Sequence, residues 1–182
     1  DLIRIGNSSI IQIGGYSGWT DLSDRTVKYD IREDVPGLTF ITALRPVSYR
    51  IDYHKVAELT GEDVFYLKDG TREVRHAPAF LLEGRQRKSQ IRQTGLIAQE
   101  VEQLVDRQAV DFNAVYHPQE EGDLYGLKYA EFTVPLIKAV QELSAMVAKL
   151  QTQMAVQAEM IAQQQAELQR LTKRSSQVAT NR

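Results

Sequence analysis

Residues 136–171 read LIKAVQELSAMVAKLQTQMAVQAEMIAQQQAELQRL and contain neither glycine nor proline. Positions spaced alternately by four and three residues run through the stretch without a break, and most of them are apolar, which is the heptad pattern of a coiled coil. A lone amphipathic helix of this length would leave its apolar stripe in water. The pattern therefore predicts packing against other helices, and further copies of the same chain are their simplest source.

The predicted seam is apolar in most layers and carries glutamine in two. Its a positions are Val140, Val147, Met154, Ile161 and Leu168, and its d positions are Leu136, Leu143, Leu150, Gln157, Gln164 and Leu171. Polar layers are more typical of a device that fixes register and oligomeric state than of a binding site. The heptads alone do not distinguish a dimer from a trimer. We expect the helix to cover residues 131–173 and the tail, residues 174–182, to fray.

Composition excludes several functional classes. The chain has 182 residues and a formal charge of −2 from 22 basic and 24 acidic residues, which gives no electrostatic case for nucleic acid or an anionic membrane as main partner. The absence of cysteine removes disulfides and thiolate sites. His54, His76 and His117 are too scattered for a metal site. We expect no metal, no cofactor and no small-molecule ligand, and the sequence has neither a signal peptide nor a membrane-spanning run.

The first 22 residues have a different sequence pattern from the rest of the chain. Residues 2–21 read LIRIGNSSIIQIGGYSGWTD, in which short β-type runs alternate with Gly and Asn turns. Such a piece would be marginal as an isolated hairpin. We interpret residues 1–22 as the end of a β-rich shaft that continues upstream.

Residues 23–130 predict a small α+β core of short strands and helices. Asp34 and the following proline introduce a helix with Leu38, Ile41 and Leu44 inward, and residues 47–52 alternate as a strand. Two apolar runs, FYL at 65–67 and AFLL at 79–82, suggest short strands. The basic stretch EGRQRKSQIR at 83–92 favours a solvated loop or strand edge over a nucleic-acid-binding patch. Residues 95–105 predict a strand entering a helix with Val101 and Leu104 inward. Two more strands are expected at 109–116 and 125–129.

One polar segment, LSDRTVKYDI at residues 22–31, has two interpretations. In the first, Ser23 or Asp24 caps a turn and Lys28 is a solvated charge. In the second, Ser23 is a nucleophile and Lys28 its base. Residues five apart face different ways on a helix and on a strand, so the second interpretation needs a turn between them.

Four segments, in this order, resemble the intramolecular chaperone domain at the C-terminal end of phage tail fibres, tailspikes and endosialidases. The same domain is classed as a self-cleaving peptidase family and is shared with the myelin regulatory factor. The segments are SDRTVKYDI at 23–31, LTFITALRPVSYRID at 38–52, GLIAQEVEQL at 95–104 and YAEFTVPLIKAVQEL at 129–143. The resemblance implies a homotrimer in which the long helix forms a trimeric coiled coil.

The resemblance also implies roles for individual residues. Ser23 falls on the nucleophile and Lys28 on its base, which places the scissile bond between Leu22 and Ser23. Asp24, Gln93 and Gln99 are possible supporting residues, and Gln99 is equally suited to donate to an oxyanion or to satisfy a buried backbone group. The chain departs from the family at Thr26, where many relatives have Arg, and at Gln93, where some have His. If that His assists catalysis in those relatives, we expect slow cleavage here.

Two functions follow as hypotheses. The first is a self-processing chaperone that trimerises, helps the upstream β-rich part of its own polypeptide to fold, and releases itself by cutting before Ser23. The second is a structural cap that trimerises a fibre or surface protein and stays attached, with Ser23 and Lys28 idle. The expected setting is a phage tail fibre or spike precursor of the virion, or a bacterial surface fibre. The expected partners are the chain itself and the upstream part.

Overall fold

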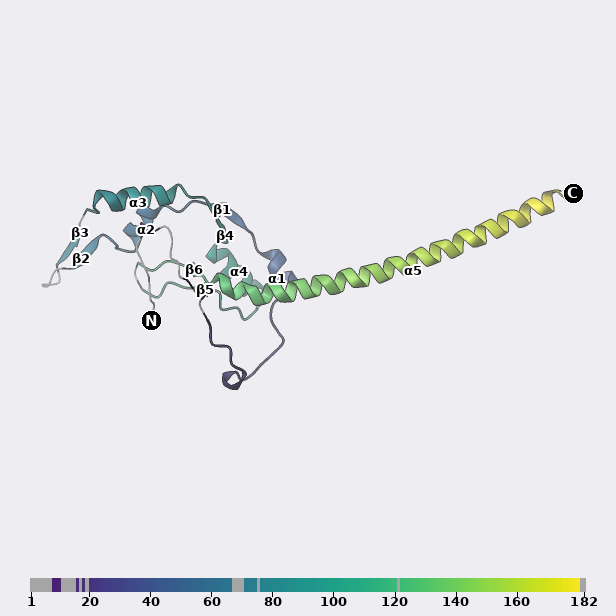
Figure 1. Ribbon diagram of the computed structural model, residues 1–182, viewed down its shortest axis with the longest axis horizontal. Helices are drawn as coiled ribbons and strands as arrows, with labels where there is room; N and C mark the ends of the chain where they lie inside the picture. Colours follow the sequence, from purple (N-terminus) through teal and green to yellow (C-terminus); the bar gives the residue numbers. More distant parts are fainter. Residues whose placement is uncertain are drawn as a thin grey trace.

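The computed structural model describes residues 8–10, 16, 18, 20–66, 71–74, 76–120 and 122–180. It is a mixed α and β molecule, as the sequence predicts, with a globular part at one end and a long C-terminal helix that projects from it (Figure 1). Most of the predicted β-rich segment 1–22 lies outside the described residues.

The elements follow one another as short pieces until the last helix. In chain order they are η1 (Arg25–Val27), α1 (Leu38–Ala43), β1 (Val47–Tyr49), α2 (Tyr53–Leu59), β2 (Val64–Tyr66), β3 (Arg72–Val74), α3 (Ala79–Ser89), β4 (Gln93–Gly95), α4 (Ala98–Gln108), β5 (Val115–Tyr116), β6 (Gly126–Leu127), η2 (Tyr129–Phe132) and α5 (Thr133–Thr180).

The described strands pair as separate antiparallel ladders. β1 pairs with β4, with Ser48 opposite Thr94. β2 pairs with β3 and β5 with β6, so that Val64 faces Val74 and Val115 faces Leu127. Ladders this short are marginal on their own. The β5–β6 ladder packs against α4 through β5.

The hydrophobic core lies where α1, α4 and the start of α5 meet. Phe40 of α1 is 1% exposed, and Val101 of α4 is 2% exposed. Phe112 lies between Phe40 and Phe132, with ring centroids 5.0 Å from each and both contacts edge to face. Burial of three aromatic rings supplies much of the driving force for so small a domain.

Helix α1 begins later than the sequence predicts. Gly37, not Asp34, occupies the N-cap position, and no side chain of its own caps the helix. The Glu142 carboxylate of α5 accepts the free N–H of Leu38 instead, at 2.7 Å. A Cβ at residue 37 would run into that carboxylate, which explains the glycine. Phe40 is the residue that α1 buries, a position the helical spacing did not single out.

Two predictions in residues 50–92 are wrong. The strand predicted for 47–52 ends at Tyr49, and α2 starts at Tyr53 because the Asp52 carboxylate accepts from the backbone N–H groups of His54 and Lys55 at 3.0 Å each. The strand predicted for AFLL and the loop predicted after it are together the helix α3. Short apolar runs do not distinguish strand from helix, which is why periodicity failed here.

Other predictions are confirmed. A strand, β4, precedes the helix α4, in which Val101 and Leu104 are buried. Strands form within FYL, 109–116 and 125–129 as β2, β5 and β6, although each is short. Among the described residues, no helix is long and apolar enough to cross a membrane.

Helix α5 is 48 residues long, which at 1.5 Å per residue is about 70 Å. It contains the whole predicted seam and is assigned as helix to Thr180; that the tail after Lys173 frays stays a prediction. At its start, Pro135 and Ala139 are buried against the globular part while Leu136 and Val140 stay exposed. The chain therefore uses one face of α5 for its own core and leaves the seam uncovered.

Candidate functional site

The segment 20–34 carries Ser23 and Lys28 and is exposed along its whole length. In Figure 1 it forms a loop that hangs away from the globular part, with η1 at its tip. Apolar side chains are exposed on it: Leu22 is 82% exposed, Tyr29 91% and Val27 59%. Several large apolar groups on one exposed loop suggest a surface that another chain covers.

A side-chain cap shapes the turn at the tip of this segment. The Asp24 carboxylate accepts from the backbone N–H of Thr26 at 2.8 Å and from the Thr26 hydroxyl at 2.7 Å, and these hydrogen bonds hold the pKa of Asp24 below its usual range. The Arg25 guanidinium donates to the backbone carbonyl of Lys28 at 3.2 Å. The cap is therefore Asp24, and it bends the chain into the 3-10 turn η1.

The turn brings Ser23 and Lys28 together. The Lys28 Nζ lies 2.8 Å from the Ser23 Oγ, to which it donates a hydrogen bond. This is the proximity that a nucleophile and its base require. An ammonium group has no lone pair, so only the neutral amine form of a lysine can accept the serine proton.

The two glutamines predicted as supporting residues lie elsewhere. Gln93 in β4 donates its side-chain N–H to the Tyr53 hydroxyl at 3.2 Å. Gln99 is exposed in the first turn of α4 and lines a groove with Tyr49 and Tyr129. In the part of the chain that the structure describes, no hydrogen bond joins either glutamine to the Ser23–Lys28 turn.

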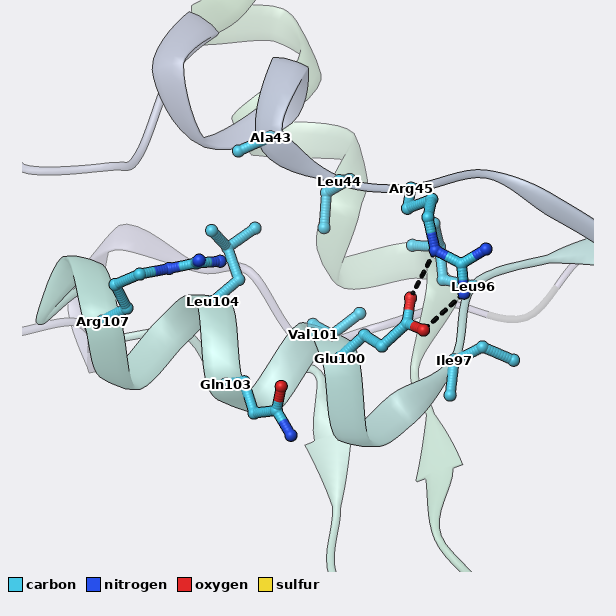
Figure 2. A pocket seen from close by; sticks show the side chains of 10 residues that line it. All are labelled: Ala43, Leu44, Arg45, Leu96, Ile97, Glu100, Val101, Gln103, Leu104 and Arg107. Carbon is cyan, nitrogen blue, oxygen red and sulfur yellow. Dashed lines mark hydrogen bonds and ion pairs between the residues drawn. The ribbon is translucent and has the colours of Figure 1, made fainter.

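A second groove, of about 330 Å³, lies between α1 and α4. Figure 2 shows Arg45 and Glu100 reaching toward each other from its two sides, and the Arg45 Nε donates to the Glu100 Oε2 at 3.0 Å. This hydrogen bond lowers the pKa of Glu100 and raises that of Arg45. The pair was not predicted, because 55 positions separate its members and no local pattern links them. It fastens the end of α1 to α4.

The basic stretch 83–92 is also not what the sequence suggested. It lies largely in α3, and Arg85 is buried with 2% of its surface exposed, whereas Arg87 and Arg92 remain exposed. The Arg85 partners are Asp63, Glu62 and Ser8. Glycine at 84, which allows close approach on a helix, was the available signal for a contact here.

In the residues that the structure describes, nothing covers the seam of α5. Val140 is 64% exposed and Met154 is 67% exposed, and the remaining seam positions, including Gln157 and Gln164, are exposed as well. Among the described residues, no group of three His, Asp or Glu side chains is placed to hold a metal ion.

Comparison with known proteins gives one match. Residues 23–110 match the family model of peptidase S74, which is described as the chaperone of endosialidase. No curated protein and no solved structure matches the chain. The matched region starts at Ser23 and includes Lys28, Gln93 and Gln99.

Proposed function

Because residues 23–110 match the family model of peptidase S74, the chaperone of endosialidase, we propose that this chain forms a homotrimer, aids the folding of the β-rich chain upstream, and then cuts itself between Leu22 and Ser23. The observation that carries the proposal is the contact of 2.8 Å between the Ser23 Oγ and the Lys28 Nζ. The family match supports it further, since it begins at the residue that would become the new N-terminus. The setting is the precursor of a fibre or spike on a virion or bacterial surface.

Trimerisation is supported by the uncovered seam. A helix of 48 residues with one apolar stripe gains little stability alone, and its apolar stripe remains in water. Three parallel helices would bury the stripe in knobs-into-holes packing and place three globular parts side by side at one end. The exposed apolar side chains of residues 20–34 would then face neighbouring copies.

The proposed cleavage is an acyl shift followed by hydrolysis. The Ser23 Oγ attacks the Leu22 carbonyl carbon while the neutral Lys28 amine takes the hydroxyl proton. The peptide C–N bond breaks as the Ser23 nitrogen gains a proton, which leaves an ester between the Leu22 acyl group and the Ser23 oxygen. Water then hydrolyses the ester and yields the Leu22 carboxylate and a chain that begins at Ser23.

Assembly gives a physical reason for the lysine to become a base. Burial disfavours the charged form of an amine, so covering the segment with a second and third copy promotes loss of the Lys28 proton. In the single chain the whole segment is exposed to water. We propose that the pair is inactive before assembly and active after it.

The chaperone role follows from folding kinetics. A β shaft of three chains must bring distant segments into register, which is slow and exposes strand edges that aggregate. A helical bundle forms from local contacts, fixes three chains together and raises the effective concentration of the shaft strands to roughly millimolar. Cutting afterwards removes the helper, and the shaft is trapped in its folded form.

Expression of the full chain followed by mass spectrometry tests the proposal. We expect a fragment whose N-terminus is Ser23, and we expect Ser23→Ala to abolish it while Thr20→Ala, at another exposed hydroxyl residue, leaves it unchanged. Lys28→Arg keeps the positive charge but removes the capacity to act as a base, so it too should stop cleavage. A fragment that persists in Ser23→Ala would show that another protease cuts the chain.

The alternative function is a trimerisation cap that never cuts. The exposure of Ser23 and Lys28 favours it, since a solvated ammonium beside a hydroxyl is also an ordinary surface contact. Chains that remain uncleaved for days in an assembled wild-type trimer would support the non-cleaving cap.

A further inference from the structure

Arg85 is the most deeply buried charged side chain in the described part of the molecule, with 2% of its surface exposed. Its guanidinium forms a two-point contact with the Asp63 carboxylate, at 2.7 Å from Nη1 and 2.8 Å from Nη2, and its Nη2 lies 3.5 Å from the Glu62 carboxylate. Bidentate geometry of this kind fixes the orientation of the guanidinium plane. The third nitrogen, Nε, is thereby aimed away from the Asp63 carboxylate.

Ser8 occupies the place at which that donor points. The Arg85 Nε donates to the Ser8 Oγ at 2.7 Å in a buried contact, and the backbone N–H of Ser8 donates to Glu62 at 3.0 Å. One residue of the upstream segment is thus bound through both its hydroxyl and its backbone. Ser8 itself is 7% exposed.

Gly84 makes room for the next residue of the upstream segment. Gly84 is buried in the middle of α3, and a Cβ at this position would lie 2.8 Å from the Ser9 Cβ. Glycine inside a helix costs about 1 kcal/mol relative to alanine. The close approach of residues 8–9 accounts for a glycine that the helix itself does not favour.

The upstream segment covers a helix with little apolar surface to bury. The buried residues of α3 are Gly84 and Arg85, whereas Phe80 is 67% exposed. The contact surface formed by Glu62, Asp63, Gly84 and Arg85 is therefore specific to a turn with a small polar residue, and we name it the Arg85 dock.

The Arg85 dock joins residues on opposite sides of the proposed cleavage point. Ser8 and Ser9 lie before Leu22, whereas the residues of the dock lie after Ser23, and the exposed segment 20–34 connects the two sides. Hydrolysis of the Leu22–Ser23 bond would break the covalent link but none of these contacts.

We propose that the Arg85 dock holds the upstream product on the chaperone domain after cleavage, so that release is a separate step from cutting. This inference rests on the proposed function, because it assigns a fate to the product of that reaction. The dock binds the Ser8–Ser9 turn of the shaft end, and the cut shaft leaves when this contact opens. Cutting can then precede release without exposing an unfinished shaft end to solvent.

The test separates the dock from self-cleavage by cutting the chain with an added protease. The recognition sequence of a site-specific protease is inserted after Asp30, within the exposed segment, in a full-length Ser23→Ala background. After cutting, size-exclusion chromatography over time measures how fast the upstream fragment leaves. We expect it to co-elute with the remainder of the chain.

Gly84→Ala places a methyl group against Ser9 in a helix position that alanine otherwise favours, so we expect release at least about tenfold faster. Gln86→Ala, at an exposed position of the same helix, is the matched control. Ser8→Ala removes the acceptor of a charged hydrogen bond without altering the domain and should also speed release about tenfold, whereas Thr20→Ala should not.

Two results would overturn the dock. One is immediate loss of the fragment from the chain that carries only the insertion and Ser23→Ala. The other is equal retention in the Gly84→Ala and Ser8→Ala variants and in their controls. Neither result depends on whether Ser23 and Lys28 cut the chain.

Discussion

The carboxylate of Glu142 accepts the backbone N–H of Leu38 at 2.7 Å, across 104 positions of sequence. This contact ties the first turn of α1 to the helix that carries the seam. The segment 20–34 leads directly into α1, so one end of the exposed loop is anchored to α5. The exposed segment that carries Ser23 and Lys28 is thereby tethered to α5 on its C-terminal side.

Loss of the Glu142 contact should weaken the anchor. Glu142→Ala leaves the first N–H of α1 without a side-chain acceptor, and we expect the free energy of unfolding to fall by about 1 kcal/mol, as for the loss of a helix cap. Chemical denaturation followed by circular dichroism measures it. Gln141→Ala changes an exposed neighbour and should have no effect, and an equal loss in both variants would contradict the capping role.

Charges in the seam should dissociate the proposed trimer. Leu143→Asp with Leu150→Asp would place three carboxylates in each of two apolar layers, a cost that the helices cannot offset. We expect the wild type to sediment as a trimer at micromolar concentration and the double variant as a monomer. Ala145→Asp with Thr152→Asp adds the same charges at f positions of the heptad and should leave the trimer intact. A wild type that sediments as a stable monomer would exclude assembly through α5.

Cleavage should depend on assembly. In an unassembled chain Lys28 is solvated and the Ser23 hydroxyl remains idle, so we expect the Leu143/Leu150 double variant to cut at least about a hundredfold more slowly than the trimer, because burial of the amine has to supply a free-energy change of several kcal/mol. Lys28→Ala should abolish cutting and still sediment as a trimer. A time course by gel and mass spectrometry compares the three proteins. Equal cutting in the dissociated variant would refute the coupling, and cutting by Lys28→Ala at the wild-type rate would refute the pair.

Acid should weaken the Arg85 cluster. Hydrogen bonds donated by Arg85 lower the pKa of Asp63, although burial opposes the shift. The unfolded state then binds a proton at a higher pH than the folded state, so the contribution to stability is full above the unfolded pKa of about 3.9 and is lost as the pH falls through the lower, folded pKa.

Asp63→Asn measures this contribution directly. We expect it to cost about 3 kcal/mol at pH 7, because it leaves the buried guanidinium with only the more distant Glu62 carboxylate as an anionic partner, and less at pH 3. Urea unfolding at the two pH values gives both numbers. Glu58→Gln, which removes an exposed ion pair with Lys55, should cost little at either pH.

Periodicity and resemblance predicted the parts of the molecule that local sequence controls. The seam of α5 repeats over several heptads, so its helix could be predicted from the sequence. The contact between Ser23 and Lys28 required only a turn within six residues. Helix α3 could not be predicted from hydrophobic periodicity, because its buried residues are Gly84 and Arg85 rather than an apolar stripe. The partners of Arg85 lie 22 and 77 positions away, and no local pattern encodes contacts over that range.

Helix α5 packs against the globular part on one face and exposes the seam on another, so in the proposed trimer stability depends on the number of chains. Ala139 is buried against the globular part while the adjacent Val140 faces water, so the same helical turn serves the fold and any bundle of copies. By mass action, association that covers Val140 stabilises the fold that buries Ala139, and the unfolding temperature rises with protein concentration. Dilution removes both together. In the proposed trimer the isolated chain is therefore the least stable form, and each further copy stabilises those already present.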